Sequence, residues 1–315
     1  MKKLLITGGA GFIGSNLVHY LQSLSSSESS TYEIVVLDAL TYAGNQANLA
    51  DLPWPGKMQF VEGDVRDWEL VQKLVANSDA VIHLAAESHV DRSISDPGIF
   101  VDTNNRGTLN ILDAATKSKK RVVIVSTDEV YGSLETGFAN EDYPINPSSP
   151  YSASKASADL LAISFHRTFG LDVVITRCSN NYGPRQYPEK LLPLAISKIL
   201  SNSGIPVYGD GSNVRDWIHV EDHCVGIHLA LTKGAPGRIY NFGDVDKISN
   251  LELIGKLLTG LDASRDLITF VEDRQGHDYR YAIDASRAKS ELGWNSRFNL
   301  EENLKDVIDW YARQN

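Results

Sequence analysis

The chain has 315 residues, of which 42% are hydrophobic, so it can form one large core or two modest ones, and we expect two lobes. Its formal net charge of −10 and the lack of any block rich in lysine and arginine argue against nucleic-acid binding, because phosphate binding relies on concentrated positive charge. Two cysteines are too few for a disulfide framework, which favours a cytoplasmic protein. The N-terminal apolar run is interrupted by Thr7 and by glycines, so we expect neither a signal peptide nor a membrane-spanning segment.

Short β-rich runs alternate with helical patterns through the first half of the chain. Strands are expected at residues 3–7, 33–38, 58–64, 79–85, 121–127 and 172–178. Strands that alternate with helices are typical of parallel sheets. The order therefore predicts an α/β fold with a doubly wound parallel sheet of the Rossmann type.

After Tyr182 the pattern changes to longer helices, turns and isolated strands. A helix is expected before this change, at residues 151–170, and further helices are expected after it, at residues 189–202, 221–233, 251–261 and 300–313. We therefore divide the chain into a first domain, residues 1–181, and a smaller C-terminal α/β domain, residues 182–315. Some segments of the second part, such as residues 215–233, are expected to return and pack on the first domain. The serine-rich stretch at residues 23–31 is expected to be a solvated loop.

A glycine-rich turn follows the first strand. Gly9, Gly11 and Gly14 satisfy G-x-G-x-x-G, and Gly8 precedes them; such glycines let backbone amides and a helix N-terminus approach a pyrophosphate. The motif alone is weak, because glycines also serve tight turns. Asp38 supplies the second half of the fingerprint, since it ends the second strand, where it can accept hydrogen bonds from ribose hydroxyls. An acid at this position repels a 2′-phosphate and favours NAD over NADP.

Two further strand ends are candidates for the same site. Asp64 follows the third strand and could contact the adenine side, and the run from Leu84 to Ser88 follows the fourth strand. Ligands of open parallel sheets collect at this edge.

A tyrosine and a lysine lie one helical turn apart. Tyr151 and Lys155 are at positions i and i+4 of an expected helix and so share one face. A nearby ammonium group lowers the pKa of a phenol from its usual value near ~10, which makes the phenol a better base. On its own this spacing more often reflects a solvated lysine that packs on a tyrosine than a catalytic pair. Beside a nicotinamide fingerprint it favours catalysis.

Taken together, these blocks resemble the extended short-chain dehydrogenase/reductase family, and within it the dTDP-glucose 4,6-dehydratases. The likeness covers nearly the whole chain through TGGAGFIG, AAESHVDRS, STDEVYG, PYSASK, CSNNYGP, PEKLLPL, GDGSNVRDW, VEDH and GHDYRYAID. Blocks such as YSASK are shared with sugar-nucleotide epimerases and decarboxylases. The Thr-Asp-Glu of STDEVYG is the discriminating block.

The resemblance implies an NAD-dependent hydro-lyase that converts dTDP-glucose to dTDP-4-keto-6-deoxyglucose and water. C4 of the sugar is oxidised, water is eliminated across C5 and C6, and the hydride returns at C6. By matching motif positions, Tyr151 would remove the 4-hydroxyl proton while Lys155 holds the cofactor ribose. Glu129 would take the C5 proton, Asp128 would protonate the leaving 6-hydroxyl, and Thr127 would hydrogen-bond the C4 oxygen.

The acid role makes a demand on Asp128. Its carboxyl must be neutral when the substrate is bound, so its pKa must rise by about three units from ~3.9. The adjacent carboxylate of Glu129 and desolvation by the sugar both act in that direction. The alternative is that the two acids are merely solvated at a strand end.

The resemblance also implies the binding residues, with the first domain holding NAD and the second the nucleotide sugar. For the cofactor these are Gly8, Gly11, Phe12, Ile13, Gly14, Asp38, Ala39, Leu40, Thr41, Asp64, Val65, Leu84, Ala85, Ala86, Ser88, Thr103, Tyr151, Lys155 and Asn181. For the substrate they are Ser88, Thr127, Asn180, Lys190, Leu191, Pro206, Tyr208, Arg215, Asn250, Arg274 and His277. No metal site is expected.

Two residues depart from the family pattern. Gln275 occupies a position where proline is common, which puts the shape of that loop in doubt, and Asn105 occupies a position where an apolar residue is commoner. Neither belongs to the catalytic set.

Three readings remain open beside the dehydratase. A sugar-nucleotide 4-epimerase or a UDP-glucuronate decarboxylase would share Tyr151 and Lys155 but would not need the acid pair. A non-catalytic NAD-binding regulator could use the same fold. The resemblance further implies a homodimer that forms through a helix bundle including the Tyr151 helix.

Overall fold

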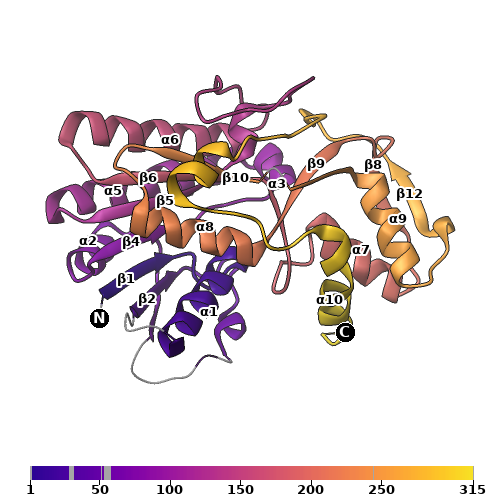
Figure 1. Ribbon diagram of the computed structural model, residues 1–315, viewed down its shortest axis with the longest axis horizontal. Helices are drawn as coiled ribbons and strands as arrows, with labels where there is room; N and C mark the ends of the chain where they lie inside the picture. Colours follow the sequence, from indigo (N-terminus) through magenta and orange to yellow (C-terminus); the bar gives the residue numbers. More distant parts are fainter. Residues whose placement is uncertain (1, 28–31, 51, 53–57, 244, 315) are drawn as a thin grey trace.

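The computed structural model describes residues 2–27, 32–50, 52, 58–243 and 245–314. Its main sheet has seven strands in the order β10-β6-β5-β4-β1-β2-β3, and every neighbouring pair is parallel (Figure 1). The strands are β1 (Lys2–Thr7), β2 (Tyr32–Asp38), β3 (Met58–Glu62), β4 (Ala80–His83), β5 (Arg121–Thr127), β6 (Val173–Cys178) and β10 (Ile239–Phe242). The predicted doubly wound fold is confirmed.

The apolar strands explain why this sheet forms. A parallel sheet covered on both faces needs hydrophobic residues at consecutive positions, and Leu4, Leu5 and Ile6 of β1 are fully buried. The strands β3 and β4 end two residues earlier than the sequence predicts. Asp64 and Ala85 therefore lie in the loops beyond the strand ends, at the carboxyl edge of the sheet.

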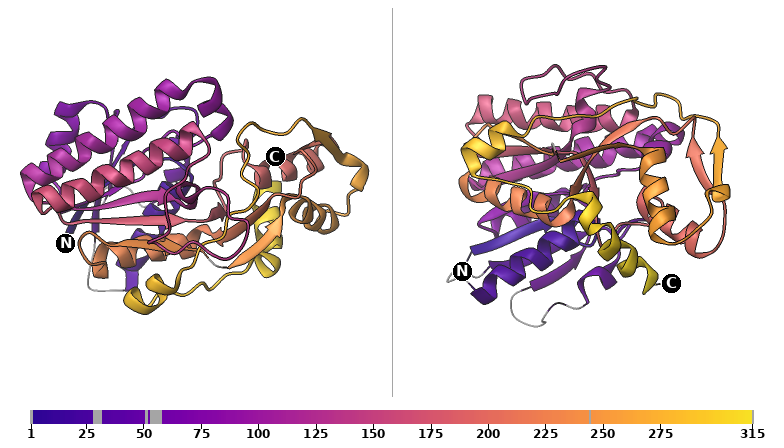
Figure 2. Two further views of the ribbon diagram at one scale, coloured as in Figure 1. Left: turned by 90° about the horizontal axis from the view of Figure 1, so that it is seen from above. Right: turned by 45° about the vertical axis from the view of Figure 1, so that its right-hand side comes forward.

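Helices cover both faces of the main sheet (Figures 1 and 2). On one face α1 (Phe12–Ser27) and α8 (Val220–Lys233) share a buried core with β1, β2 and β5. On the other face α2 (Trp68–Ala76), α5 (Gly107–Ser118) and α6 (Pro150–Phe169) pack on β4, β5 and β6. The result is a three-layer lobe.

A smaller lobe lies beside the carboxyl edge of the main sheet, at the right of Figure 1. It contains the strands β7 (Asn180–Tyr182), β8 (Ile205–Tyr208), β9 (Val214–His219), β11 (Asp246–Ser249) and β12 (Ile268–Val271) and the helices α7 (Leu191–Leu200), α9 (Asn250–Gly260) and α10 (Leu300–Ala312). The three helices enclose a separate apolar core that includes Leu192, Ile254 and Leu304. The two lobes are not two continuous stretches of the chain. The elements α8 and β10 belong to the large lobe, although β9 before them and β11 after them belong to the small lobe.

The remaining elements are short. They are η1 (Gln46–Leu49), α3 (Val90–Ser95), α4 (Pro97–Phe100), the π-helical η2 (Val101–Arg106), η3 (Asp128–Tyr131), η4 (Arg265–Leu267) and the π-helical η5 (Ala288–Leu292). The serine-rich stretch differs from the prediction, since α1 continues through Ser27; residues 28–31 lie outside the described part. Among the described helices, none has the length and apolar character needed to cross a membrane.

A buried ion pair joins α6 to the sheet. Arg177 of β6 donates from Nε to Oδ2 of Asp159 on α6 at 2.9 Å, and both side chains are almost completely buried. The guanidinium also lies over the ring of Tyr131, 4.8 Å from its centroid. The Tyr131 hydroxyl in turn donates to Asn241 of β10 at 2.8 Å. This network links β6, β10 and the turn that contains Tyr131 to α6, the longest of the described helices.

The ion pair gives a stability prediction. Arg177→Met leaves the Asp159 charge buried without its partner, which should lower the free energy of unfolding by ~3–5 kcal/mol in urea denaturation. Lys256→Met is the matched control, because Lys256 pairs with Glu301 at 2.9 Å on the surface. The control should cost at most ~1 kcal/mol. Equal losses in the two variants would contradict a dominant role for the buried pair.

Candidate active site

The glycine-rich turn brings β1, β4 and α1 close together. Gly8 has φ of +70°, and a Cβ atom there would lie 2.6 Å from the Ala85 nitrogen; a Cβ atom on Gly14 would lie 2.1 Å from the Gly8 oxygen. Neither position can hold a side chain without a shift of backbone. At Gly11, by contrast, a Cβ atom would meet only the Gly8 oxygen, at 3.4 Å, and the residue lines a cavity. The N-terminus of α1 therefore faces this cavity with exposed backbone.

Asp38 ends β2 inside the same cavity. Its carboxylate accepts hydrogen bonds from the backbone nitrogens of Ala10 and Leu40, both at 2.9 Å. Burial raises the pKa of Asp38, and these two hydrogen bonds oppose the rise. Each oxygen has further acceptor capacity, so the carboxylate can still receive hydroxyl donors from the cavity.

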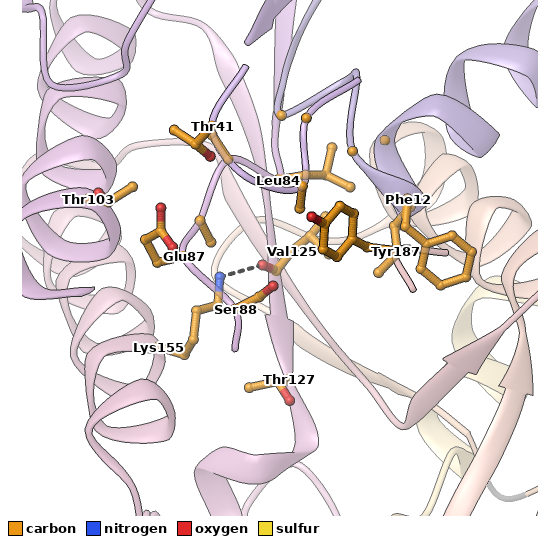
Figure 3. A pocket seen from close by; sticks show the side chains of 18 of the residues that line it. Phe12, Thr41, Leu84, Glu87, Ser88, Thr103, Val125, Thr127, Lys155 and Tyr187 are labelled. Carbon is orange, nitrogen blue, oxygen red and sulfur yellow. Dashed lines mark hydrogen bonds between the residues drawn. The ribbon is translucent and has the colours of Figure 1, made fainter. Parts of the chain in front are cut away.

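The cavity brings together most of the predicted cofactor residues (Figure 3). Its lining includes Gly8, Gly11, Phe12, Ile13, Gly14, Asp38, Ala39, Thr41, Asp64, Val65, Leu84, Ala85, Ala86, Ser88, Thr103, Tyr151, Lys155 and Asn181. Leu40 differs, because its side chain packs against the hydrophobic core and only its backbone contacts Asp38. Gly9 lies against Val36 and is not part of the lining.

The start of α6 is defined by its sequence. Ser149 and Ser152 form a reciprocal capping box, with Ser152 N donating to Ser149 Oγ at 3.1 Å, and Pro150 occupies the first turn. Tyr151 is consequently placed in the first turn of the helix, at the wall of the cavity. Lys155, one turn later, donates from Nζ to the Val125 carbonyl at 2.8 Å, as the dashed line in Figure 3 shows.

The surroundings of Tyr151 do not by themselves make it a base. Burial raises the pKa of the phenol well above its usual value, and the Glu129 charge adds to the rise, whereas a hydrogen bond with Thr127 opposes it. Burial likewise lowers the pKa of the Lys155 ammonium. The sequence-based expectation is that Lys155 and an oxidised nicotinamide together lower this pKa, and the protein groups alone leave it raised. The phenol needs further positive charge or a polar ligand in the cavity before it ionises near neutral pH.

Two acids follow the end of β5 on one tight turn. The Thr127 hydroxyl accepts from Glu129 N at 3.2 Å and so caps η3, which carries both Asp128 and Glu129. Adjacent residues of a 3₁₀ turn point in directions roughly 120° apart. The two carboxyl groups thus face different parts of the cavity.

Asp128 has the environment of a neutral acid. Its side chain is 3% exposed, and burial raises its pKa well above the usual value, with the charges of Glu129 and Asp216 acting in the same direction. Its Oδ2 atom is buried and has no hydrogen-bond partner among the described residues. A protonated oxygen in this position could donate to a ligand. Burial also raises the pKa of Glu129, but the positive charges of Lys190 and Arg215 oppose that rise.

A second cavity adjoins the first and lies between the lobes. The two share Glu129, Asn180 and Lys190, so they form one continuous cleft. The second cavity gathers the rest of the predicted substrate residues, namely Leu191, Pro206, Tyr208, Arg215, Asn250, Arg274 and His277. Ser88 and Thr127 line the first cavity instead.

Two arginines occupy the second cavity in different ways. Arg215 is held by backbone carbonyls, with Nη2 donating to Asp278 O at 2.9 Å, and it stacks 4.4 Å from the centroid of Tyr281. Arg274 instead pairs with Asp91 of α3, its Nη2 donating at 2.9 Å, so this contact crosses from one lobe to the other. Arg215 is fixed, whereas Arg274 can exchange one anionic partner for another.

The structure also explains the two unusual residues. Asn105 donates through Nδ2 to Ser157 Oγ and so ties the π-helical segment to α6. Gln275 precedes Gly276, whose φ of +63° sets the turn, and a Cβ atom there would lie 2.8 Å from the Ser148 oxygen. The glycine therefore provides the turn even where proline is absent.

Several lining residues were not predicted from the sequence. Tyr42, Glu87, Tyr187 and Glu189 line the first cavity, and Asp91 lines the second. Glu87 could have been found, because it lies inside the run from Leu84 to Ser88. Asp91 and Glu189 lie within the blocks AAESHVDRS and PEKLLPL, whereas Tyr42 and Tyr187 lie outside the motifs and only the fold places them at the cleft.

Comparison with known proteins agrees with this geometry. The sequence profile described as GDP-mannose 4,6 dehydratase matches residues 5–307. The chain belongs to the GDP-mannose 4,6 dehydratase family. The resemblance to nucleotide-sugar dehydratases of the extended short-chain dehydrogenase/reductase family is thereby confirmed.

Individual relatives of this family member are similar over their whole length. The chain is 51% identical to the dTDP-glucose 4,6-dehydratase of Streptomyces antibioticus, over 98% of this chain and 92% of that protein. The crystal structure of DesIV, the dTDP-glucose 4,6-dehydratase of Streptomyces venezuelae with NAD and dTDP bound, superposes with a TM-score of 0.96 at 48% identity and covers 99% and 97% of the two chains. A UDP-glucose 4-epimerase of Thermotoga maritima with UDP-glucose gives 0.90 at 28% identity and 99% coverage of both chains.

The raised pKa of Asp128 gives a pH-dependent prediction. The unfolded carboxyl titrates near ~3.9, so the folded protein binds one more proton between that pH and the folded pKa, and stability falls as pH rises through this window. Asp128→Asn removes the decline. The variant should therefore gain stability relative to the parent protein as pH increases from about 4, as measured by urea unfolding at a series of pH values.

Asp210→Asn is the control for this titration. Asp210 is exposed, and its hydrogen bonds with Ser212 lower its pKa. Its substitution should change stability with the opposite pH dependence. A difference between Asp128→Asn and the parent that does not vary with pH would show that Asp128 is already ionised in the folded protein.

Proposed function

We propose that the protein is an NAD-dependent dTDP-glucose 4,6-dehydratase, a hydro-lyase that forms dTDP-4-keto-6-deoxyglucose and water. The observation that carries this proposal is the pair of acids on one turn, the buried Asp128 and the partly buried Glu129, where a dinucleotide cavity and a nucleotide-sugar cavity meet. The similarity to dTDP-glucose 4,6-dehydratases along the whole chain supports it.

The first cavity fits NAD. Gly11 and the N-terminus of α1 offer close backbone approach for a pyrophosphate, and the Asp38 carboxylate suits two ribose hydroxyls and repels a 2′-phosphate. When bound, NAD supplies a hydride acceptor that later acts as the hydride donor. Thr103, Ser88 and Asn181 line the same cavity.

Removal of the proton from the sugar 4-hydroxyl falls to Tyr151. The Thr127 hydroxyl, which hydrogen-bonds the phenol, can also donate to the oxygen at C4. The Lys155 ammonium, held by the Val125 carbonyl, adds positive charge beside the phenol. Since burial and Glu129 raise the phenol pKa, this charge and that of the oxidised cofactor are both needed for Tyr151 to act near neutral pH.

Each of the two acids performs one proton transfer in the elimination of water. Once C4 is a ketone, the C5 proton is acidic, and the carboxylate of Glu129 accepts it; burial raises the pKa of Glu129, and the charges of Lys190 and Arg215 oppose that rise. The departing 6-hydroxyl needs a proton, and the neutral Asp128 donates one from its unpartnered oxygen. The protons balance, since one is removed at C5 and one is delivered at C6.

The second cavity would hold the nucleotide. Arg215 and Arg274 are suited to a diphosphate, and Tyr208 offers an aromatic face beside them. Arg274 would then leave Asp91 for the phosphate. Lys190, Leu191, Pro206, Asn180, Asn250 and His277 complete the lining of this site.

The alternatives account for less of the structure. A 4-epimerase or a UDP-glucuronate decarboxylase would use Tyr151 and Lys155, but it has no use for an acid with a raised pKa beside C6. A non-catalytic NAD-binding regulator would need none of Thr127, Asp128 and Glu129.

We further propose that the protein is a homodimer in the cytoplasm. Leu109 of α5 and Leu160 of α6 are large apolar side chains that are 40% and 55% exposed on the outer helical layer, which suits a bundle formed with a second copy. Both cysteines are buried free thiols, as in a reducing compartment.

Leu160 provides the test of the dimer. Leu160→Glu places a charge on the proposed interface and should convert the protein to monomer in light scattering. Phe270→Glu is the control, because Phe270 is 57% exposed on β12 in the other lobe. A dimer that survives Leu160→Glu unchanged, or a monomeric parent protein, would contradict this interface.

The reaction itself is tested by isotope incorporation and a substrate panel. Turnover of dTDP-glucose in deuterated water should give a 4-keto-6-deoxy product with deuterium at C5, detected by NMR. Among dTDP-, UDP-, GDP- and CDP-glucose, the dTDP sugar should react fastest. A product that retains its 6-hydroxyl would refute the dehydratase and favour an epimerase, and no turnover with any of the four despite bound NAD would favour the regulator.

Asp128→Asn separates the steps of the same reaction. Because the amide cannot protonate the leaving hydroxyl, water loss should slow at least 100-fold while oxidation at C4 continues, so the absorbance of reduced nicotinamide should rise transiently. Equal loss of both steps would show that Asp128 has a different role.

A further inference from the structure

Three segments that are distant in the sequence meet beside the dinucleotide cavity. Tyr42 lies in the loop after β2, Arg92 lies on α3, and Tyr187 lies in the loop between β7 and α7. The Arg92 guanidinium stacks on the Tyr42 ring, 3.9 Å from its centroid. Tyr42 and Tyr187 meet edge to face, with centroids 5.6 Å apart and planes at 88°. The Tyr42 hydroxyl also lies 3.4 Å from Ser88 Oγ.

This contact spans the cleft beside the glycine-rich turn. Tyr42 and Tyr187 both line the cavity that Gly11 and Phe12 line, and Figure 3 shows the Tyr187 ring beside Phe12 at the start of α1. Tyr42 comes from the large lobe, and Tyr187 is carried by the chain on its way into the small lobe. Both rings therefore border the space that a dinucleotide bound along the sheet edge would occupy.

The proposed reaction requires a barrier to the exit of the cofactor. The two electrons removed from C4 must return to C6 of the same sugar, so the cofactor that takes them must stay bound through the elimination. A cofactor that leaves between these steps ends the cycle without product. Slow cofactor exit is therefore a requirement separate from binding affinity for the substrate.

We propose that Tyr42, Arg92 and Tyr187 form a clasp that slows the exit of the bound dinucleotide. This inference rests on the proposed function, from which the dinucleotide is taken to be NAD. An edge-to-face aromatic pair and a guanidinium stacked on a ring each stabilise the closed arrangement modestly. Because the three side chains share Tyr42, the contacts open together when that ring is lost. The clasp acts on the rate of cofactor release and leaves the chemistry at Thr127 and Asp128 unchanged.

The test measures the rate of NAD release from the full-length protein. Protein loaded with isotopically labelled NAD is mixed with excess unlabelled NAD, and the retained label is followed by native mass spectrometry. Tyr42→Ala and Tyr187→Ala should each release NAD about tenfold faster than the parent protein, or more. The double variant should be little faster than Tyr42→Ala, since both changes break one contact. Tyr42→Phe keeps the ring and should release NAD within about twofold of the parent rate.

Controls separate the clasp from general loosening and from the proposed function. Tyr279→Ala removes a tyrosine that is 55% exposed and lies outside both cavities, so it should leave the release rate unchanged. Parent-like release from both Tyr42→Ala and Tyr187→Ala would overturn the clasp even if the parent protein holds NAD and converts the sugar. A parent protein that retains no NAD would instead count against the proposed function. Activity lost during turnover by Tyr42→Ala and restored by added NAD would support the clasp.

Discussion

The buried pair of Asp159 and Arg177 joins the elements that carry the residues proposed to be catalytic. Asp159 lies one turn after Lys155 on α6, so the helix that presents Tyr151 is fixed to β6 at this point. The same guanidinium stacks on Tyr131, the last residue of the turn that carries the two acids. The base and the acids come from different elements, and this one ion pair sets the position of both. A buried charge pair of this kind specifies geometry more than it adds stability.

The groups proposed to be catalytic are in an environment that opposes their charged forms. Burial raises the pKa of Asp128 and of Tyr151 and lowers that of Lys155. Folding therefore yields a cleft with a neutral acid and a neutral phenol, next to a carboxylate that two cations favour. The ligands complete the electrostatics, since an oxidised nicotinamide adds positive charge and a diphosphate adds negative charge near Arg215 and Arg274. Stability is lower at such a site than it could be, and function is the reason.

Much of the fold follows from local pattern, because apolar strands alternate with helical segments and some helices, such as α6 and α9, begin with a capping box. The glycine-rich turn, Asp38 and the run from Thr127 to Glu129 are also contiguous or tied to a strand end, so their place at the sheet edge can be read from the sequence. The contact of Asp91 with Arg274 cannot, since 183 positions separate the two residues and only packing of the lobes brings them together. Leu40 has φ of +48° and its partly buried side chain packs against the core, so its place in the cofactor site stays a prediction.

The strand β10 of the main sheet is far in sequence from the other strands of that sheet. β10 pairs with β6 in parallel, yet 60 residues of the small lobe and α8 separate them, from position 179 to position 238. A growing chain that has been synthesised only to the end of β6 would present that strand as an open edge with unpaired backbone groups. Such an edge invites pairing with another chain. The two lobes are thus bound to one folding event, and the first cannot be cut away as a self-contained domain.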